Sequence, residues 1–242
     1  MAHPQLQSTC AEPHHCSPAV RQQVLGLSPL TRDLPELQRD QLSKKLTSYS
    51  WAADELIFRA GDIPAGAYLL VAGRVRLTHD TAEGQELTVQ IACPGDVLGS
   101  LHTHPVETNE TATALETVCA LFIPASHLES LIAEYPGLAI ALVRLQQENL
   151  ASTRADEIAL TTRTVAQRVA GALLQLDRKM GVDVQDGARL LQVKLRRSDI
   201  AGLAGTTVES ASRTMARFKN EGLVESGREW VKILDRQALE SI

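Results

Sequence analysis

The sequence predicts an α+β protein with an antiparallel β-roll, a long helix and a small C-terminal helical domain. Between residues 50 and 124, short apolar runs alternate with glycine-containing turns, at the roughly 10-residue spacing typical of antiparallel strands. After Pro136, apolar residues recur at intervals of three and four, which indicates a helix. The last third of the chain contains two short helical patterns separated by a glycine, followed by strand-like runs.

Composition limits the class of protein. A chain of 242 residues favours two domains over one core, and the longest apolar runs end after about seven residues, well short of the roughly 20 that span a bilayer. The N-terminus lacks the basic start and apolar stretch of a secretory signal. We therefore expect a cytoplasmic protein without membrane contact. In that compartment the four cysteines are expected to be thiols, metal ligands or redox sensors rather than structural disulfides.

Charge is distributed unevenly along the chain. Residues 1–160 contain 10 Lys and Arg against 19 Asp and Glu, whereas residues 161–242 contain 14 against 10. A basic C-terminal third behind an acidic front part suggests that only the C-terminal third meets a polyanion.

The first predicted segment is an N-terminal arm, residues 1–29. Cys10, Cys16, His14 and His15 lie in its polar beginning, where no apolar periodicity is seen up to about residue 20, so we expect a loop or a conditionally ordered arm. Leucines at near-helical spacing then predict a short helix over residues 34–47.

The β-roll is assigned to residues 30–132. Strands are predicted at 55–59, 67–71, 75–78 and 87–91, with turns at Gly61, Gly73, Gly84 and Gly95. The absence of a βαβ rhythm favours an antiparallel roll or sandwich.

The long helix is assigned to residues 133–163. Its stripe consists of Leu138, Leu142, Leu145, Asn149, Ser152, Asp156 and Ala159. This stripe either lies on the roll or packs against a second copy of the chain as a dimerisation seam. In a seam, Asn149 and Asp156 would weaken the dimer, as regulated dimerisation requires.

Residues 164–242 are predicted to form a winged helix-turn-helix domain. A helix over 165–179 precedes a short helix capped by Ser198, a turn at Gly205, and a second helix capped by Thr206. Two strand-like runs around a glycine turn, residues 223–234, form the wing.

The second helix of this motif carries polar residues suited to reading DNA bases. Glu209, Ser212 and Arg213 are spaced to share one face; arginine pairs with guanine and glutamate accepts from cytosine in the major groove. The alternative for Glu209 is a capping box with Thr206. Nearby basic residues are expected to contact phosphates or to form a solvated surface: Lys194, Arg196, Arg197, Arg217, Lys219 and Arg228.

Three motifs accompany this order of elements: Phe58-x-Ala60-Gly61-Asp62, Pro94-Gly95-Asp96-Val97-Leu98-Gly99 and Thr207-Val208-Glu209-Ser210-Ala211-Ser212-Arg213. Together, the order and the motifs closely resemble the CRP/FNR superfamily of bacterial transcription regulators. The resemblance covers residues 30–240. It implies a homodimer that binds a roughly palindromic operator and contacts RNA polymerase, as a transcription activator does. It also implies that Glu209, Ser212 and Arg213 read TTGAT-type half-sites, as in the FNR branch.

The resemblance also bears on the effector. The stretch that holds cyclic AMP in some members has Ser100 in place of its glutamate, lacks the phosphate-binding arginine and carries Glu110 nearby, which disfavours an anionic ligand. The FNR branch instead implies an oxygen- or nitric-oxide-labile [4Fe-4S] cluster bound by arm cysteines and a roll cysteine, here Cys10, Cys16 and Cys119. One arm cysteine is missing. We assign the fourth ligand to Cys93.

Several alternatives remain open at this stage. His14, His15 or a carboxylate such as Glu12 could be the fourth ligand, and Cys93 and Cys119 could simply be small buried residues. A thiol-disulfide regulator would pair Cys10 or Cys16 with Cys119 or Cys93, and a haem sensor would use His102, His104 or an arm histidine. An enzyme on a cupin-like roll is not expected, because the predicted strands contain no histidine and no nucleophile-base set is seen.

Overall fold

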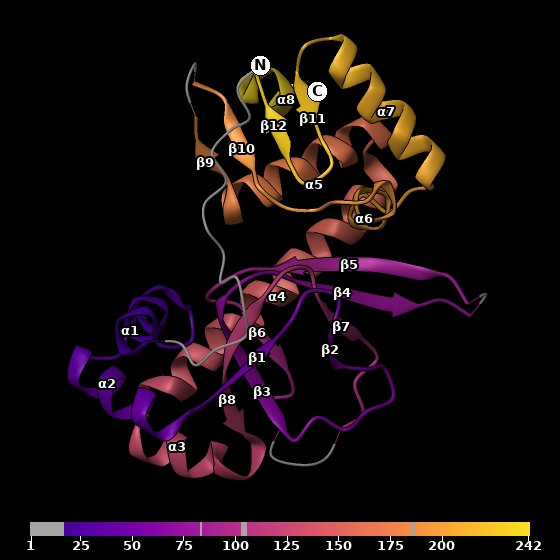
Figure 1. Ribbon diagram of the computed structural model, residues 1–242. Coiled ribbons are helices and arrows are strands. Elements are labelled where there is room, and N and C mark those ends of the chain that lie inside the picture. The colour runs from indigo at the N-terminus through magenta and orange to yellow at the C-terminus, as the bar shows by residue number, and fades with distance from the viewer. Residues whose placement is uncertain (1–16, 83, 103–105, 185–186) are drawn as a thin grey trace. The chain divides into compact units, whose positions relative to one another are not determined.

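The computed structural model describes residues 17–82, 84–102, 106–184 and 187–242 (Figure 1). Several residues with predicted roles lie outside these ranges: Cys10, Glu12, His14, His15, Cys16 and His104. Among the described residues, no helix is long and apolar enough to cross a membrane.

The helices are α1 (Pro18–Leu27), α2 (Glu36–Lys45), α3 (Leu128–Glu134), α4 (Gly137–Thr162), α5 (Val165–Met180), α6 (Arg197–Leu203), α7 (Val208–Asn220) and α8 (Arg236–Glu240), with a 3-10 turn, η1, at Ala125–His127. The first eight strands are β1 (Thr47–Trp51), β2 (Leu56–Phe58), β3 (Gly66–Ala72), β4 (Val75–Asp80), β5 (Glu86–Ala92), β6 (Val97–Gly99), β7 (Thr111–Ala114) and β8 (Val118–Pro124). The C-terminal strands are β9 (Val182–Asp183), β10 (Arg189–Leu191), β11 (Val224–Ser226) and β12 (Val231–Ile233).

The eight N-terminal strands form two four-stranded sheets, in the orders β1-β8-β3-β6 and β2-β7-β4-β5. The predicted antiparallel roll is therefore present, and the observed α+β architecture agrees with the predicted fold class. The described chain divides into two compact units: residues 17–79 with 92–154, and residues 80–91 with 155–242.

Side chains of β3 and β8 alternate between two apolar clusters, as the two-residue period of a strand requires. Leu70 and Ala120 face the cluster inside the roll. Leu69, Cys119 and Leu121 face a second cluster, to which the helices α1, α2, α3 and α4 contribute. One sheet of the roll is thus covered by the N-terminal helices and by the first part of α4.

Half of the few aromatic side chains gather on the inner face of the sheet β1-β8-β3-β6. Tyr49, Trp51, Tyr68 and Phe122 form stacked, tilted and edge-to-face pairs with ring centroids 5.0–6.3 Å apart. Such pairs stabilise a core beyond the area that they bury. Trp51 and Tyr68 also pack against the cluster inside the roll.

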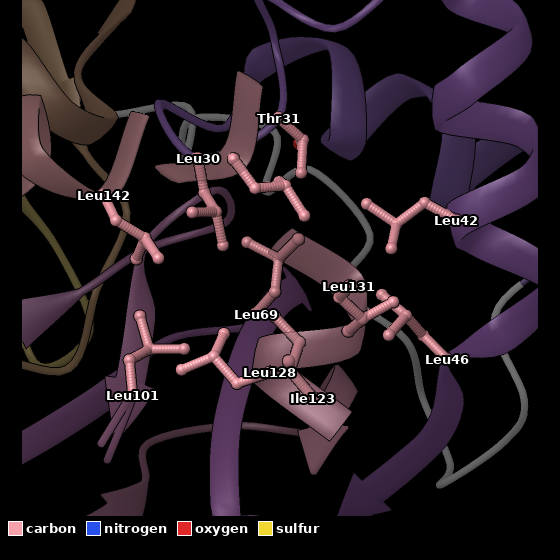
Figure 2. Close-up of a pocket in the computed structure, with 11 residues that line it drawn as sticks. Leu30, Thr31, Leu42, Leu46, Leu69, Leu101, Ile123, Leu128, Leu131 and Leu142 are labelled. Carbon is pink, nitrogen blue, oxygen red and sulfur yellow. The ribbon is translucent and has the colours of Figure 1, made fainter. Parts of the chain in front are cut away.

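The helix-covered layer contains a small cavity, shown in Figure 2, between Leu30 and Leu42 near the N-terminus, Leu69 and Ile123 of the sheet, and Leu131 of α3. Its volume of about 10 Å³ is far below the several hundred Å³ of a typical ligand site. This cavity is therefore too small to hold an effector.

The stripe predicted on the long helix is divided in the structure. Leu138 is 5% exposed and, with Leu142, packs in the cluster that covers the sheet, so the beginning of the stripe lies on the roll. Other apolar side chains of α4 remain exposed, among them Ile140 at 57%, Val143 at 59% and Leu150 at 53%. The helix thus has a second apolar face, which the predicted stripe did not include.

In the C-terminal unit, α5 packs against α6, α7 and α8. An ion pair anchors this unit: Asp177 of α5 is 1% exposed and its Oδ1 accepts from Arg189 Nε at 2.7 Å. Arg189 also donates to the carbonyl of Gly181 at 2.7 Å and pairs with Asp183 at 2.7 Å. These contacts join the end of α5 to β9 and β10.

Candidate DNA-binding surface and sensory site

The predicted helix-turn-helix is formed by α6 and α7, with β11 and β12 as the wing (Figure 1). The two predicted capping residues were wrong. Arg196, not Ser198, precedes α6, and the Asp199 side chain accepts from its N–H at 2.7 Å. Thr206 belongs to the turn, because its N–H bonds back to the Ala201 carbonyl at 2.9 Å.

Thr207 is the N-cap of α7, and its hydroxyl accepts from the Ser210 N–H at 3.2 Å. The alternative role of Glu209 was a capping box with Thr206. That box is not formed, because Thr207 rather than Thr206 is the N-cap of α7. Within the described chain, no hydrogen bond or ion pair occupies the Glu209 or Arg213 side chain.

Burial on α7 separates a packed face from an outward one. Ala211, Met215 and Phe218 are buried, whereas Glu209 and Arg213 are exposed and Ser212 is half-buried. The three predicted base-reading residues thus share the outward face near the start of the helix, where major-groove contacts are made.

Three of the six basic residues expected to meet phosphates, Arg197, Arg217 and Lys219, differ in their surroundings. Arg197 donates to Ser226 Oγ at 3.3 Å, which links α6 to the wing. Arg217 lies 3.6 Å from Glu221, one turn further on. Lys219 is exposed. All three are in the domain that contains the outward face of α7.

Arg168 of α5 was not predicted to have a role, although it holds the turn of the motif. Its Nε donates to the Ala204 carbonyl at 2.9 Å, and its Nη2 donates to the Gly205 carbonyl at 3.3 Å. Gly205 adopts a φ of +55°, in the left-handed region that favours glycine. An arginine within an amphipathic helix gives no sign in the sequence that it binds a distant turn.

The candidate sensory site lies in the other unit. Cys119 of β8 is 0% exposed and belongs to the cluster that contains Val24 and Leu25 of α1. The end of the N-terminal arm is thus a helix that packs in the same apolar cluster as this cysteine. Residues 18–20 were expected to belong to the loop, and no helix was predicted before residue 34. The helix is stabilised by packing, since Leu25 is 0% exposed, and by the Ser17 side chain, which caps it.

Cys93 lies in the turn between β5 and β6 and is 5% exposed. Its N–H donates to Asp96 Oδ2 at 3.0 Å. Two residues further on, the Gly95 carbonyl accepts from the Ser28 hydroxyl at 2.8 Å. The turn that contains Cys93 is therefore fastened to the end of the arm.

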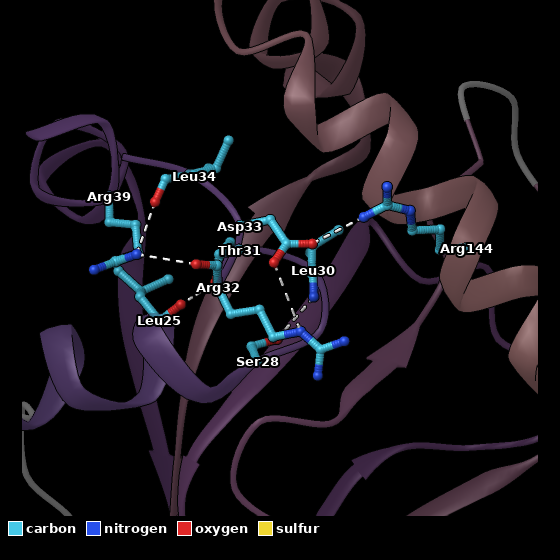
Figure 3. A network of polar contacts seen from close by, with 9 residues as sticks. All are labelled: Leu25, Ser28, Leu30, Thr31, Arg32, Asp33, Leu34, Arg39 and Arg144. Carbon is cyan, nitrogen blue, oxygen red and sulfur yellow. Dashed lines mark hydrogen bonds and ion pairs between the residues drawn. The ribbon is translucent and has the colours of Figure 1, made fainter. Parts of the chain in front are cut away.

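Figure 3 shows how the segment after α1 is held. The Thr31 hydroxyl donates to the Leu25 carbonyl at 2.6 Å, and Arg39 Nη1 donates to the Leu34 carbonyl at 2.7 Å. Asp33 pairs with Arg144 of α4 at 3.0 Å. The segment that follows the arm is thus linked through polar contacts to α1 and to the first part of the long helix.

The loop that would hold a cyclic phosphate is not cationic. From Gly99 to Thr111 the sequence contains no lysine or arginine. Burial raises the pKa of the Glu110 carboxyl, and the His79 side chain partly opposes this shift. His102, a candidate haem ligand, is exposed, and its N–H donates to the Ser100 hydroxyl at 3.3 Å.

No group of three or more histidine, cysteine or acidic side chains in the described residues could hold a metal ion. Cys93 and Cys119 are the two predicted ligands with described surroundings, and Cys10 and Cys16 lie outside the described ranges. A four-ligand cluster would need those two arm residues as well.

Comparison with known protein families finds two matches in chain order. Residues 49–135 match the cyclic nucleotide-binding domain, and residues 167–242 match the Crp-like helix-turn-helix domain. The fold, together with the outward face of α7, defines a DNA-binding transcription regulator rather than an enzyme.

Individual relatives agree with this class. The chain is 31% identical to the cyclic AMP receptor protein of Thermus thermophilus over 77% of its length and 83% of the relative. It is 28% identical to the transcriptional activator protein FnrA of Stutzerimonas stutzeri, over 75% of its length and 74% of the relative. The structure of FixK2 from Bradyrhizobium japonicum superposes with a TM-score of 0.70 at 25% identity, covering 81% of this chain and 96% of that one.

The chain belongs to the CRP/FNR family of transcription regulators. Its Crp-like domain implies DNA binding, and regulators of this family act as dimers.

Proposed function

We propose that the protein is an FNR-like regulator that acts in the cytoplasm. Its homodimer binds a palindromic operator with TTGAT-type half-sites and contacts RNA polymerase. Its N-terminal arm senses oxygen or nitric oxide through a [4Fe-4S] cluster held by Cys10, Cys16, Cys119 and Cys93. The outward face of α7 is the observation that supports the DNA-binding part of this proposal.

That face supports base reading by three residues. Glu209 and Arg213 are exposed and have no partner among the described residues, so neither must break a contact before it meets a base. Arg213 suits a bidentate contact to guanine, and Glu209 suits the amino group of cytosine. Arg197, Arg217 and Lys219 are proposed as phosphate contacts.

A substitution at Arg213 tests this assignment. The operator is first selected from random duplexes, and affinities are then measured on the operator and on unrelated DNA. Arg213→Ala is expected to cost about 1–3 kcal/mol on the operator and to relax the preference at one base position. An equal loss on unrelated DNA would make Arg213 a phosphate contact.

The second apolar face of α4 supports dimerisation through that helix. Ile140, Val143 and Leu150 are more than half exposed and are separated by three and seven residues, a spacing compatible with a coiled-coil seam. The beginning of the predicted stripe is occupied by the roll. We therefore propose Ile140, Val143 and Leu150 as the core of the seam.

The sensory part of the proposal is supported by the position of α1. Its first residue follows Cys16 by two positions, and Leu25 packs in the cluster that contains Cys119. The end of the arm and the buried cysteine therefore occupy one layer. When bound, a [4Fe-4S] cluster supplies an oxidant-labile centre held by thiolates.

Packing around Cys119 sets a condition on this proposal. Cys119 is fully buried and belongs to the same apolar cluster as Val24 of α1 and Val71 of β3. Ligation by Cys119 therefore requires this cluster to open, and because α1 contributes to it, hydrogen exchange of the α1 amides should become faster in the iron-loaded protein. The Asp33–Arg144 pair would carry such a change to α4.

Metal and sulfide analysis tests the cofactor directly. Protein purified without oxygen should contain about four irons and four sulfides per chain, and Cys119→Ser or Cys16→Ser should lower both together. Ser100→Ala, which changes no proposed ligand, serves as the control. An iron-free product would refute the cluster. Loss of two protons under oxidant without metal would identify a thiol-disulfide regulator instead.

A further inference from the structure

Strand β5 meets the first helix of the helix-turn-helix at Thr88. The Thr88 side chain is 3% exposed and Asp199 of α6 is 1% exposed, and both belong to the same compact unit. The Thr88 hydroxyl donates to Asp199 Oδ1 at 2.9 Å. The other oxygen, Oδ2, accepts from the Arg196 N–H at 2.7 Å. One buried carboxylate therefore joins β5 to the first turn of α6.

Gly202 brings the same two elements into backbone contact. A Cβ at this position would lie 2.4 Å from the Thr88 carbonyl oxygen and 2.8 Å from its nitrogen, closer than any side chain could approach. Glycine inside a helix costs about 1 kcal/mol relative to alanine, so the close approach explains its presence. Gly171 in α5 differs, because its nearest neighbour would be 3.8 Å away.

The position of α6 determines that of the recognition helix. Gly205 N–H donates to the Gly202 carbonyl at 3.0 Å, and Thr206 N–H donates to the Ala201 carbonyl at 2.9 Å. Through these bonds the turn follows α6, and α7 begins directly after it. A displacement of α6 from β5 would therefore move the outward face of α7 as well.

We propose that Thr88, Asp199 and Gly202 are positioning residues for operator recognition. Their contact holds each helix-turn-helix so that the two copies in a dimer meet successive half-sites, which lie about 34 Å apart on B-DNA. None of the three is among the proposed base-reading residues. The inference rests on dimeric DNA binding and is independent of the proposed cluster.

Two variants of the full chain test the contact. Thr88→Val removes the hydroxyl at nearly constant shape, and Gly202→Ala places a methyl group against the Thr88 backbone. Matched controls are Thr88→Ser, which keeps the hydroxyl, and Gly171→Ala, which adds the same methyl group to a helix with room for it. Circular dichroism establishes that each variant is folded.

Affinity is measured on the operator selected with the wild-type protein, on the same operator with one extra base pair between the half-sites, and on a single half-site. Thr88→Val and Gly202→Ala are expected to lose about tenfold on the operator, of the order of one hydrogen bond to a charged group, while half-site affinity is retained. In these two variants, the affinities for the operator and for the operator with the extra base pair should also differ less than in the wild type. The controls Thr88→Ser and Gly171→Ala should match the wild type.

Two results would overturn the inference. Unchanged operator affinity in Thr88→Val would show that the contact does not position the motif. An equal loss on the half-site and on the operator would show that it only maintains the fold of the domain. If Arg213→Ala left the base preference unchanged, the proposed function would be weakened. The comparison of the two operator spacings would still stand.

Discussion

At the scale of single residues, the stability of the C-terminal unit depends on Asp177. This carboxylate is 1% exposed and lies 2.7 Å from Arg189 and 3.6 Å from Arg236. Among the described residues, removing Arg189 leaves the buried carboxylate paired only with the more distant Arg236, a change of the kind that costs several kcal/mol.

We therefore expect Arg189→Ala to lower the free energy of unfolding by about 3 kcal/mol, measured by urea denaturation. Arg217→Ala is the matched control. Its partner Glu221 is half exposed, and surface pairs contribute at most about 1 kcal/mol. Similar losses in the two variants would contradict the role given to the buried pair.

A second residue-scale prediction concerns Glu116, which lies 3.0 Å from Arg74. Burial raises the pKa of the Glu116 carboxyl, with Arg74 opposing the shift. Because the pKa is higher in the folded state than in the unfolded state, the folded protein binds more protons as this group titrates, and its contribution to stability falls as pH rises.

The stability difference between the wild type and Glu116→Gln isolates this contribution. Relative to the variant, the wild type should lose stability as pH rises from the ordinary glutamate range through the raised pKa. Chemical denaturation at a series of pH values measures the difference. A difference that grows in favour of the wild type with rising pH would show that Arg74 outweighs burial.

At the scale of elements, the exposed apolar face of α4 predicts where the dimer forms. Leu150→Glu would bring two like charges together across the two-fold axis at a cost of several kcal/mol, so the variant should sediment as a monomer at concentrations where the wild type is a dimer. Leu37→Glu on α2, where the leucine is 70% exposed, should remain dimeric. A seam along Asn149 and Ser152 would instead leave the Leu150 variant unaffected.

The same helix shows what the sequence could and could not predict. The start of α4 after Pro136 and the wing strands followed from local pattern. Apolar residues occur on more than one face of α4, so periodicity alone could not decide which residues pack on the roll. Helix α1 was missed because its ten residues are too few for stability without tertiary contacts, here those of Val24 and Leu25.

The site residues also fall into those that the sequence could predict and those that it could not. Glu209 and Arg213 were identifiable because their spacing on a predicted helix defines a face. Thr88, Arg168 and Gly202 were not, because each acts on a segment distant in sequence, and a lone threonine, arginine or glycine carries no pattern. The ligand roles of Cys10, Cys16, Cys93 and Cys119 remain predictions.

At the scale of the whole molecule, the uneven charge distribution predicts the salt dependence of DNA binding. Only the part after residue 160 has a positive balance, so phosphate contacts should come from that part alone. Lys219→Ala should reduce the slope of log K against log salt by about 0.9, the value for one lost phosphate contact. Lys44→Ala, in the acidic part, should leave the slope unchanged. A reduced slope in Lys44→Ala would show that DNA also contacts the N-terminal part.

The aromatic cluster of the roll also has a use in observing the protein. The chain has two tryptophans: Trp51 lies among the rings of Tyr49 and Tyr68, and Trp230 lies in the wing, where its carbonyl accepts from the Gly227 N–H at 2.9 Å. Each unit therefore has its own intrinsic fluorophore. In Trp230→Phe the emission reports on the roll alone, and in Trp51→Phe on the wing alone, so effector and operator binding can be followed separately without an attached dye.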